Sequence, residues 1–197
     1  MRKIHISRKH FLRSALTILV GAFIAWMVDT TNNSTNQTAD KPTTLIQHSS
    51  DFETIEGIAF AVDGDSLKID KTTNIRLLEI DAPEFSQKCL DKNGYEYRCG
   101  EISSNFLHKL INGKKITCKS PEKDIYKRYL AVCYLGEINI NQEIIKNGMA
   151  IIYDVKTASD EVIKLESEAK ASKLGVWQGA FLEPKEYRKK NKKKNTE

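Results

Sequence analysis

The sequence predicts an α+β domain built on a small β-barrel. Three observations support this fold class. Two apolar runs flank an Asp-Gly-Asp turn, an amphipathic helical segment follows them, and a second hairpin separates this segment from two further helical segments. Strands that come first, followed by helices and a hairpin without regular alternation, are typical of α+β domains rather than of βαβ repeats.

The first three predicted strands form a meander. Residues 55–62 and 66–69 lie on either side of the turn at 63–65, and residues 74–80 follow a polar turn at 70–73. Short apolar runs bounded by Asp, Gly and Asn are the usual signature of such hairpins.

The first predicted helix covers residues 101–112. Ile102, Phe106 and Leu110 recur at i, i+4 and i+8, and Gly113 ends the segment. This spacing places the three side chains on one helical face. We therefore expect this face to pack into the core.

The second half of the domain combines a hairpin with two helices. Residues 114–120 and 128–135 are the predicted strands of the hairpin. A short helix follows at 141–147 and a longer one at about 159–172, whose first turn is acidic as the helix dipole favours.

The chain divides into four parts. Residues 1–28 combine a basic start with an apolar run at 15–28, which is too short for an ordinary membrane span and suits a signal peptide or an N-terminal signal anchor. Residues 29–50 are polar and predict a disordered linker. We expect a folded domain at 51–184 and a basic tail at 185–197, outside the cytoplasm and secreted, periplasmic or tethered to the membrane by the apolar run.

The four cysteines agree with export. They all follow the linker and none forms a C-x-x-C pair of the kind that zinc sites favour: Cys89, Cys99, Cys118 and Cys133. Sequence order favours two disulfides, the first closing an irregular loop between Cys89 and Cys99. The second would bridge two strands between Cys118 and Cys133. Each closure is expected to stabilise the fold by about 3 kcal/mol.

The formal charge of +5 comes from the ends of the chain. Residues 51–184 hold 18 basic and 22 acidic residues, a net charge of −4. The overall charge is therefore poor support for nucleic-acid binding. The lysine-rich segment at 185–197 is typical of a solvated tail, although it could also hold a polyanion through phosphate contacts.

An acidic cluster is the candidate site. Between residues 62 and 85 it contains one arginine, Arg76, and six carboxylates: Asp63, Asp65, Asp70, Glu79, Asp81 and Glu84. An EF-hand is excluded because Leu67 and Lys68 occupy positions that need an oxygen ligand and a glycine. Strand alternation places Arg76 and Asp81 on opposite faces, so they converge only if the strand bends. Spacing alone leaves two interpretations open, a hard-cation site or solvated charge.

The ordered motifs DGDSLKI, IRLLEIDAPE, DIYKRYLAVCY, INQEIIKNGMA and KLGVWQG resemble the staphylococcal nuclease (thermonuclease) family over residues 55–179. The resemblance implies a five-stranded OB-fold barrel with three helices. It also implies a Ca²⁺-dependent phosphodiesterase that cleaves DNA and RNA with little sequence preference and leaves 3′-phosphate ends.

The resemblance implies a role for individual residues. Asp65 and Asp81 would supply carboxylates to Ca²⁺, and the backbone carbonyl of Ala82 would add an oxygen. Glu84 would be the general base.

Two arginines and two tyrosines complete the implied site. Arg76 and Arg128 would bind the scissile phosphate. Tyr126 matches a tyrosine at the nucleotide-binding edge, and Tyr153 matches another across a one-residue gap. The family's Tyr-Gly-Arg stands here with Lys127 in place of glycine.

The chemistry asks for the same residue types. Attack on a phosphodiester builds negative charge on the non-bridging oxygens, which a hard cation and bidentate guanidiniums oppose.

Two alternatives remain: a non-catalytic OB-fold module of the cell envelope that only binds nucleic acid, and a structural envelope protein held by disulfides. The sequence indicates no protein partner.

Overall fold

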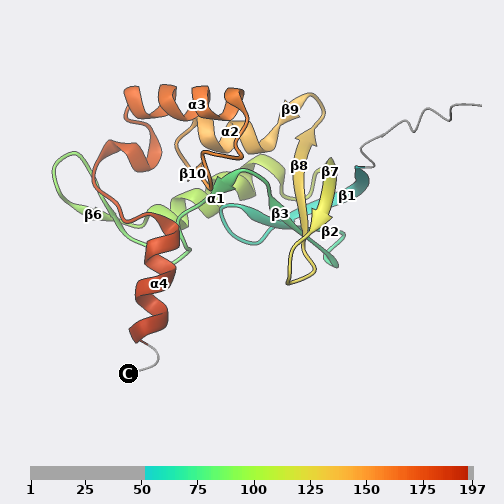
Figure 1. Ribbon diagram of the computed structural model, residues 1–197, viewed down its shortest axis with the longest axis horizontal. Coiled ribbons are helices and arrows are strands. Elements are labelled where there is room, and N and C mark those ends of the chain that lie inside the picture. Colours follow the sequence, from blue (N-terminus) through green and yellow to red (C-terminus); the bar gives the residue numbers. More distant parts are fainter. Residues whose placement is uncertain (1–51, 195–197) are drawn as a thin grey trace, which may run out of the picture. The chain divides into compact units, whose positions relative to one another are not determined.

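Five strands form a closed barrel in the computed structural model, which describes residues 52–194 (Figure 1). They are β1 (Glu53–Ala61), β2 (Ser66–Ile69), β3 (Thr73–Leu77), β7 (Lys115–Lys123) and β8 (Tyr129–Leu135). Neighbouring strands run antiparallel in the order β3-β2-β1-β7-β8, and β3 closes the barrel by pairing parallel to β8. The predicted α+β OB-fold is therefore confirmed.

Shorter strands extend the barrel. The pair β4 (Ile80–Asp81) and β10 (Ile151–Ile152) forms one small sheet, and β5 (Cys89–Leu90) and β6 (Glu96–Tyr97) form another. β9 (Ile138–Asn139) continues the main sheet next to β8. The strand expected at 74–80 is thus interrupted: β3 ends at Leu77, and β4 begins at Ile80.

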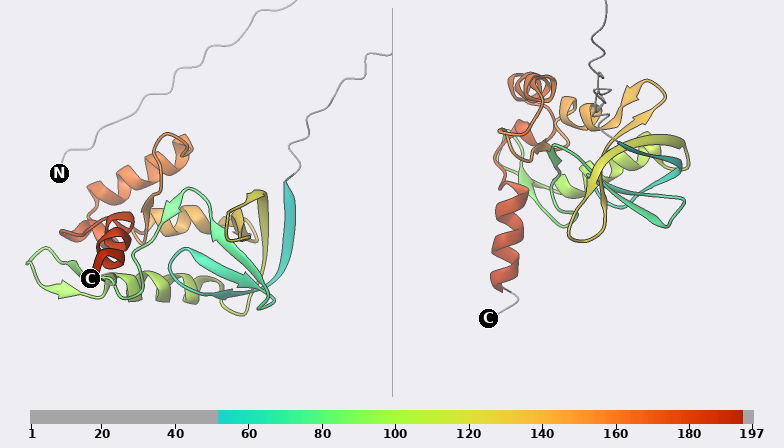
Figure 2. Two further views of the ribbon diagram at one scale, coloured as in Figure 1. Left: turned by 60° about the horizontal axis from the view of Figure 1, so that its bottom comes forward. Right: turned by 45° about the vertical axis from the view of Figure 1, so that its right-hand side comes forward.

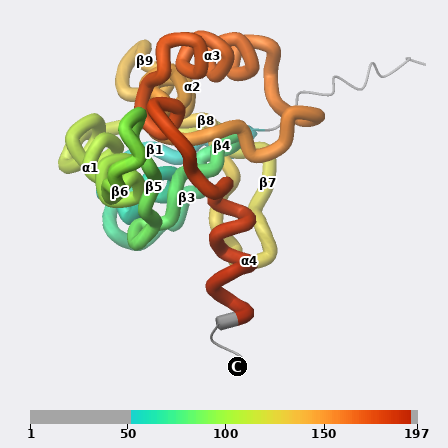
Figure 3. Tube along the Cα trace, turned by 90° about the vertical axis from the view of Figure 1, so that its left-hand side faces the viewer, coloured from blue at the N-terminus to red at the C-terminus, as the bar shows by residue number. Residues whose placement is uncertain are grey.

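The helices are α1 (Cys99–Ile111), α2 (Ile140–Lys146), α3 (Asp160–Ala171) and α4 (Pro184–Lys194), with a 3₁₀ turn at η1 (Gly175–Gln178). Three α-helices were expected, and α4 is the fourth within the described residues. It lies where the sequence predicted a basic tail, and it projects from the rest of the domain in the right-hand view of Figure 2 and in Figure 3. None of the helices in residues 52–194 is both long and apolar enough to cross a bilayer. The predicted signal segment and linker lie outside the described residues.

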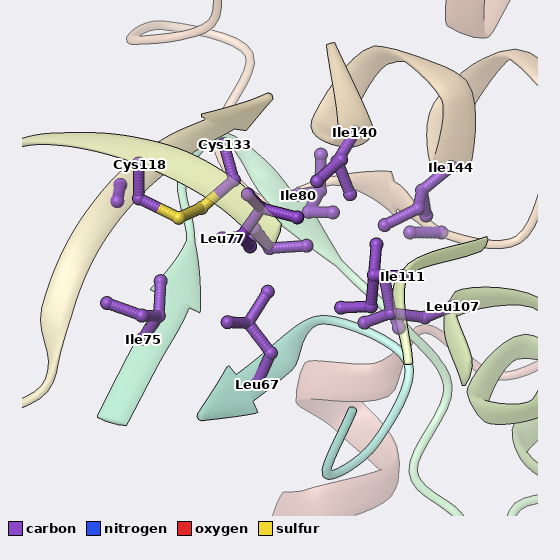
Figure 4. Packing of buried hydrophobic residues seen from close by; sticks show 14 of the residues in the cluster. Leu67, Ile75, Leu77, Ile80, Leu107, Ile111, Cys118, Cys133, Ile140 and Ile144 are labelled. Carbon is purple, nitrogen blue, oxygen red and sulfur yellow. A yellow bond between two sulfur atoms is a disulfide. The ribbon is translucent and has the colours of Figure 1, made fainter. Parts of the chain in front are cut away.

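The core lies between the barrel and the first two helices. Figure 4 shows Leu67, Ile75 and Leu77 of the barrel facing Leu107 and Ile111 of α1, with Ile140 and Ile144 of α2 closing the cluster. All of these side chains are at most 1% exposed. Full burial of one such side chain contributes about 1.5–3 kcal/mol, so this cluster holds the helices on the barrel.

The buried face of α1 differs from the expected one. Ile102 is 46% exposed, and Phe106 and Leu110 are only partly buried at the edge of the core. The residues that face inward are one position further along the helix: Ser103, Leu107 and Ile111, together with Cys99 and Gly100. The reason is close approach, because small residues at the start of α1 let the helix lie directly against the backbone near Glu84.

The protein has two disulfides within its described residues. They join the cysteine pairs that sequence order favoured. Cys118 and Cys133 lie opposite each other on β7 and β8, with both side chains buried (Figure 4). Cys89 and Cys99 join β5 to the start of α1 and belong to a second, smaller apolar cluster with Ile151.

Candidate active site

Asp65 ends the turn between β1 and β2, and its carboxylate points into the protein. The residue is 2% exposed, and Oδ2 accepts a hydrogen bond of 2.6 Å from the backbone nitrogen of Ala82. Asp63 shapes the turn, since its carboxylate accepts the backbone N–H of Asp65 at 3.1 Å. Gly64 is needed because a Cβ there would lie 2.6 Å from that of Ala82. The turn thereby brings a buried carboxylate against the segment that follows β4.

Arg76 joins Asp65 to Asp81. Its Nη1 donates to Oδ1 of Asp65, and its Nη2 donates to Oδ1 of Asp81 at 2.8 Å. Both carboxylate side chains are 3% exposed, whereas that of Arg76 is 17% exposed. One guanidinium therefore lies between two buried carboxylates and keeps one side open to solvent.

A turn between β3 and β4 makes this meeting possible. Glu79 adopts a φ of 67°, so the chain does not continue the strand alternation that would have separated Arg76 from Asp81. The turn is held from two sides. The side-chain amide of Asn141 donates to the carbonyl of Leu78 at 3.0 Å, and the carboxylate of Glu79 accepts the backbone N–H of Ser159 at 2.7 Å. The strand therefore bends between Arg76 and Asp81, which the sequence alone did not show.

Burial controls the electrostatics of Asp65. It raises the pKa of this carboxyl to about 7, and the negative charges of Asp63 and Asp81 act in the same direction. The positive charge of Arg76 and the hydrogen bond from Ala82 oppose that rise. The ionised form of Asp65 therefore depends on positive charge beside it.

Glu84 follows β4 on a loop that is tied at both ends. The side chain of Glu84 is 39% exposed. Gln87 is completely buried, accepts the backbone N–H of Glu84 at 3.3 Å and donates to the carbonyl of Leu182 at 2.6 Å. Gly100 packs so closely that an added Cβ would lie 1.8 Å from the carbonyl oxygen of Glu84. The backbone of the candidate base is therefore fixed while its carboxylate reaches solvent.

Arg128 pairs with a different carboxylate, that of Asp124. It directly precedes β8, and the next residue, Tyr129, pairs with Ile75 of β3. Its Nε and Nη2 both contact Oδ2 of Asp124, at 2.8 and 2.7 Å. Lys127 has a φ of 63°, a backbone conformation that favours glycine.

The two tyrosines are exposed, and each ring lies near a different basic side chain. Tyr126 is 71% exposed, and its ring lies 5.5 Å from the guanidinium carbon of Arg128. Tyr153 is 56% exposed, and its ring centre lies 6.0 Å from Nζ of Lys185 on α4. The structure thus brings together Asp65, Arg76, Asp81, Ala82 and Glu84, and it shows Arg128 in contact with Asp124 and Tyr126.

The family model described as staphylococcal nuclease homologue matches residues 74–179. This stretch runs from β3 through the disulfide loop to η1 and includes Arg76, Asp81, Glu84 and Arg128. The chain belongs to the staphylococcal nuclease family.

Several relatives of this nuclease-family chain bear names that include endonuclease. An uncharacterized endonuclease of Haemophilus influenzae is 34% identical over 135 residues, which cover 66% of this chain and 70% of that protein. Endonuclease YncB of Bacillus subtilis is 30% identical over 161 residues, covering 76% of this chain and 74% of the relative. The succinoglycan biosynthesis protein ExoI of Rhizobium meliloti is 31% identical over 127 residues, and the match spans 64% of this chain and 65% of that protein.

The nuclease-family site fits a hard cation by its donor chemistry. Asp65 and Asp81 present carboxylate oxygens to one shared guanidinium, so positive charge is already stabilised between them. Ca²⁺ and Mg²⁺ prefer such oxygen ligands. Within residues 52–194, no group of three or more His, Cys, Asp and Glu side chains is placed to hold a metal. The side chains of residues 52–194 would therefore supply only part of a coordination shell to a cation.

The sequence analysis missed one residue that contacts the candidate site. Arg188 of α4 donates to both carboxylate oxygens of Asp81, at 2.9 and 3.0 Å, and to Glu84 at 2.8 Å. A lysine-rich segment is typical of a solvated tail, so the sequence did not predict this contact. One signal was available: Arg188 is the sole arginine after Arg128 in a segment that otherwise uses lysine.

Proposed function

We propose that this protein is a Ca²⁺-dependent nuclease that hydrolyses phosphodiester bonds of DNA and RNA with little sequence preference and leaves 3′-phosphate ends. One observation carries the proposal: the guanidinium of Arg76 lies between Asp65 and Asp81, with Glu84 joined to Asp81 through Arg188. Family membership and the relatives named as endonucleases support it.

Asp65, Asp81 and the backbone carbonyl of Ala82 are the groups that would hold the cation. A bound Ca²⁺ supplies positive charge against the non-bridging phosphate oxygens in the transition state. Water and a substrate oxygen would complete its shell, since Asp65 and Asp81 provide only two side-chain ligands.

Arg76 is the residue that would bind the scissile phosphate. A guanidinium carries five N–H donors, and the contacts to Asp65 and Asp81 use two of them. The remaining donors lie on a side chain that is 17% exposed. Arg76 can therefore stay fixed by the carboxylates while it contacts a phosphate oxygen.

Glu84 is the proposed general base. Its carboxylate is accessible to water while its backbone is held by Gln87 and Gly100. It would take a proton from the attacking water as the new O–P bond forms. The bond from phosphorus to the 5′ oxygen breaks, and that oxygen takes a proton from solvent, which leaves the phosphate on the 3′ side.

Arg128 and Tyr126 are proposed to contact the substrate from the start of β8. Arg128 would have to exchange part of its pairing with Asp124 for a phosphate oxygen. The exposed ring of Tyr126 offers a stacking surface for a base or sugar. Tyr153 is proposed as a second such surface.

We also propose that the protein acts outside the cytoplasm. Two disulfides favour an oxidising compartment. The apolar run at 15–28, which lies outside the described residues, is the proposed signal or membrane tether.

The test is cleavage of plasmid DNA, single-stranded DNA and RNA by the full chain, with Ca²⁺ and with chelator. We expect cleavage only with Ca²⁺, and its loss by at least about 100-fold in Glu84→Gln. The matched control is Glu96→Gln, since Glu96 forms a surface pair with Lys88. Unchanged cleavage in chelator would reject the cation. Binding without cleavage under every condition would favour the non-catalytic module instead.

A further inference from the structure

Arg188 makes the densest set of charged contacts around the candidate carboxylates. Its guanidinium forms three hydrogen bonds of 2.8–3.0 Å, two to Asp81 and one to Glu84. Its side chain is 33% exposed, so part of it also faces solvent. It contacts the residues proposed to hold the cation and to take the proton.

The fold positions Arg188 through two contacts made by residues that precede it in the chain. The hydroxyl of Tyr187 lies 3.2 Å from that of Ser86 on the loop after Glu84. Just before α4, the carbonyl of Leu182 accepts the buried side-chain amide of Gln87 at 2.6 Å. The start of α4 is therefore anchored to the loop that carries the proposed base.

Two arginines share one carboxylate oxygen. Oδ1 of Asp81 accepts Nη2 of Arg76 at 2.8 Å and Nη1 of Arg188 at 2.9 Å. Arg128, the expected second phosphate ligand, instead pairs with Asp124. The second guanidinium that the structure places beside Arg76 is thus Arg188.

Charge balance shows what Arg188 adds. Asp65, Asp81 and Glu84 contribute three negative charges, and Arg76 and Arg188 offset two of them. A divalent cation would turn the remaining negative charge into one positive charge. Without Arg188 the same loaded cluster would be neutral, and it would attract a phosphodiester anion far less.

Contact geometry shows when Arg188 would change partners. Its two nitrogens contact both oxygens of Asp81, so this bidentate contact competes with a cation for the same oxygens. A guanidinium matches phosphate as well as carboxylate, because both present paired oxygens. When the cation displaces Arg188 from Asp81, a phosphate group of the bound nucleic acid becomes the anion that this guanidinium can contact.

We propose that Arg188 is a phosphate-binding arginine of the active site, which rests on Asp81 and Glu84 until cation and nucleic acid replace those contacts. This inference rests on the proposed nuclease function. It gives α4 a place in substrate binding.

The experiment compares Arg188→Gln, Arg188→Lys and the control Arg98→Gln in the full chain. Arg98 is a matched control because its side chain is 74% exposed and, among residues 52–194, forms its ion pair with Glu101 one helical turn away. Three quantities are measured: kcat and KM on single-stranded DNA, Ca²⁺ affinity by calorimetry without nucleic acid, and binding of a phosphorothioate oligonucleotide with Ca²⁺. Circular dichroism and melting temperature check that each variant is folded.

We expect Arg188→Gln to lower kcat by about 100-fold, as loss of one phosphate donor typically does. Arg188→Lys should have a kcat between those of Arg188→Gln and the wild type, and Arg98→Gln should have the wild-type kcat. Ca²⁺ affinity of Arg188→Gln should rise about tenfold, because a competitor held by charged hydrogen bonds is removed. Oligonucleotide binding with Ca²⁺ should weaken in the same variant.

An unchanged or raised kcat in Arg188→Gln would overturn the proposal and leave Arg188 as a competitor of the cation alone. A wild type that cleaves nothing would reject the proposed function instead. Arg188 would then be judged by oligonucleotide binding with Ca²⁺. Weaker binding by Arg188→Gln supports its contact with phosphate, and equal binding overturns it.

Discussion

Arg76 donates a hydrogen bond of 2.8 Å to Asp81 across a turn, although strand alternation would place the two residues on opposite faces. The turn depends on Glu79, whose φ is 67°. Local backbone conformation therefore decides whether the two charged groups meet.

The first prediction concerns this turn. Glu79→Val and Glu79→Gly both remove the contact to Ser159, but only valine is penalised at positive φ. We expect the valine variant to unfold more easily than the glycine variant by about 1 kcal/mol or more, and to cleave more slowly. Urea titration and turnover measure the two effects. Equal stability of the variants would show that the turn is not strained by a branched side chain.

The second prediction concerns Arg128. Arg128→Lys should slow cleavage strongly, by about 100-fold, because an ammonium cannot reproduce a two-pronged contact with phosphate. Asp124→Asn serves as the companion variant, since it weakens the hold on Arg128 without removing the guanidinium. Turnover of both variants at saturating Ca²⁺ is the measurement. A lysine variant with wild-type turnover would mean that only the charge matters there.

The third prediction separates the two disulfides. Replacing either pair by serine should lower the stability by about 3 kcal/mol, according to loop closure. Only the loss of the bond between Cys89 and Cys99 should also reduce turnover, because Cys99 begins α1 next to the glycine that packs on Glu84.

Both serine variants are measured by melting and by turnover well below the melting temperature. The bond between Cys118 and Cys133 lies within a hairpin and serves as the matched control. Full turnover after removal of the first bond would limit its role to stability.

The fourth prediction tests the contact between Gly100 and Glu84. Gly100→Ala places a Cβ 1.8 Å from the carbonyl oxygen of Glu84, so helix and loop must move apart. We expect a loss of about 1–3 kcal/mol in stability and a lower kcat with little change in KM. Ser104→Ala in the same helix is the control. If Gly100→Ala retains wild-type kcat, the position of this carbonyl does not limit catalysis.

Much of the fold was predictable because local signals encode it. Apolar runs and turn residues predicted β1 to within two residues and β2 at its observed bounds, and the helices predicted at 141–147 and about 159–172 match α2 and α3 to within one residue at each end. The site carboxylates came from the resemblance, since spacing alone could not separate a cation site from solvated charge.

Three features were not predictable, each for a physical reason. Glutamate is not a residue type that indicates a positive φ, so the turn at Glu79 could not be predicted from the sequence. The inward face of α1 is set by close packing of Gly100 and Ser103, which apolar periodicity does not weigh. A lysine-rich helix such as α4 has no apolar stripe, so the ion pairs of Arg188 with Asp81 and Glu84 could be seen only in three dimensions.

The parallel pairing of β3 with β8 also bears on how the chain reaches its native state. The disulfide loop, α1 and β7 all lie between the paired residues in the sequence, so this contact closes a long loop. Contacts of that kind carry a large entropic cost and are slow to form. Until they form, β3 presents an open edge to other chains. Barrel closure is therefore expected to be the late, rate-limiting step of folding, and the period before it is when aggregation competes with folding.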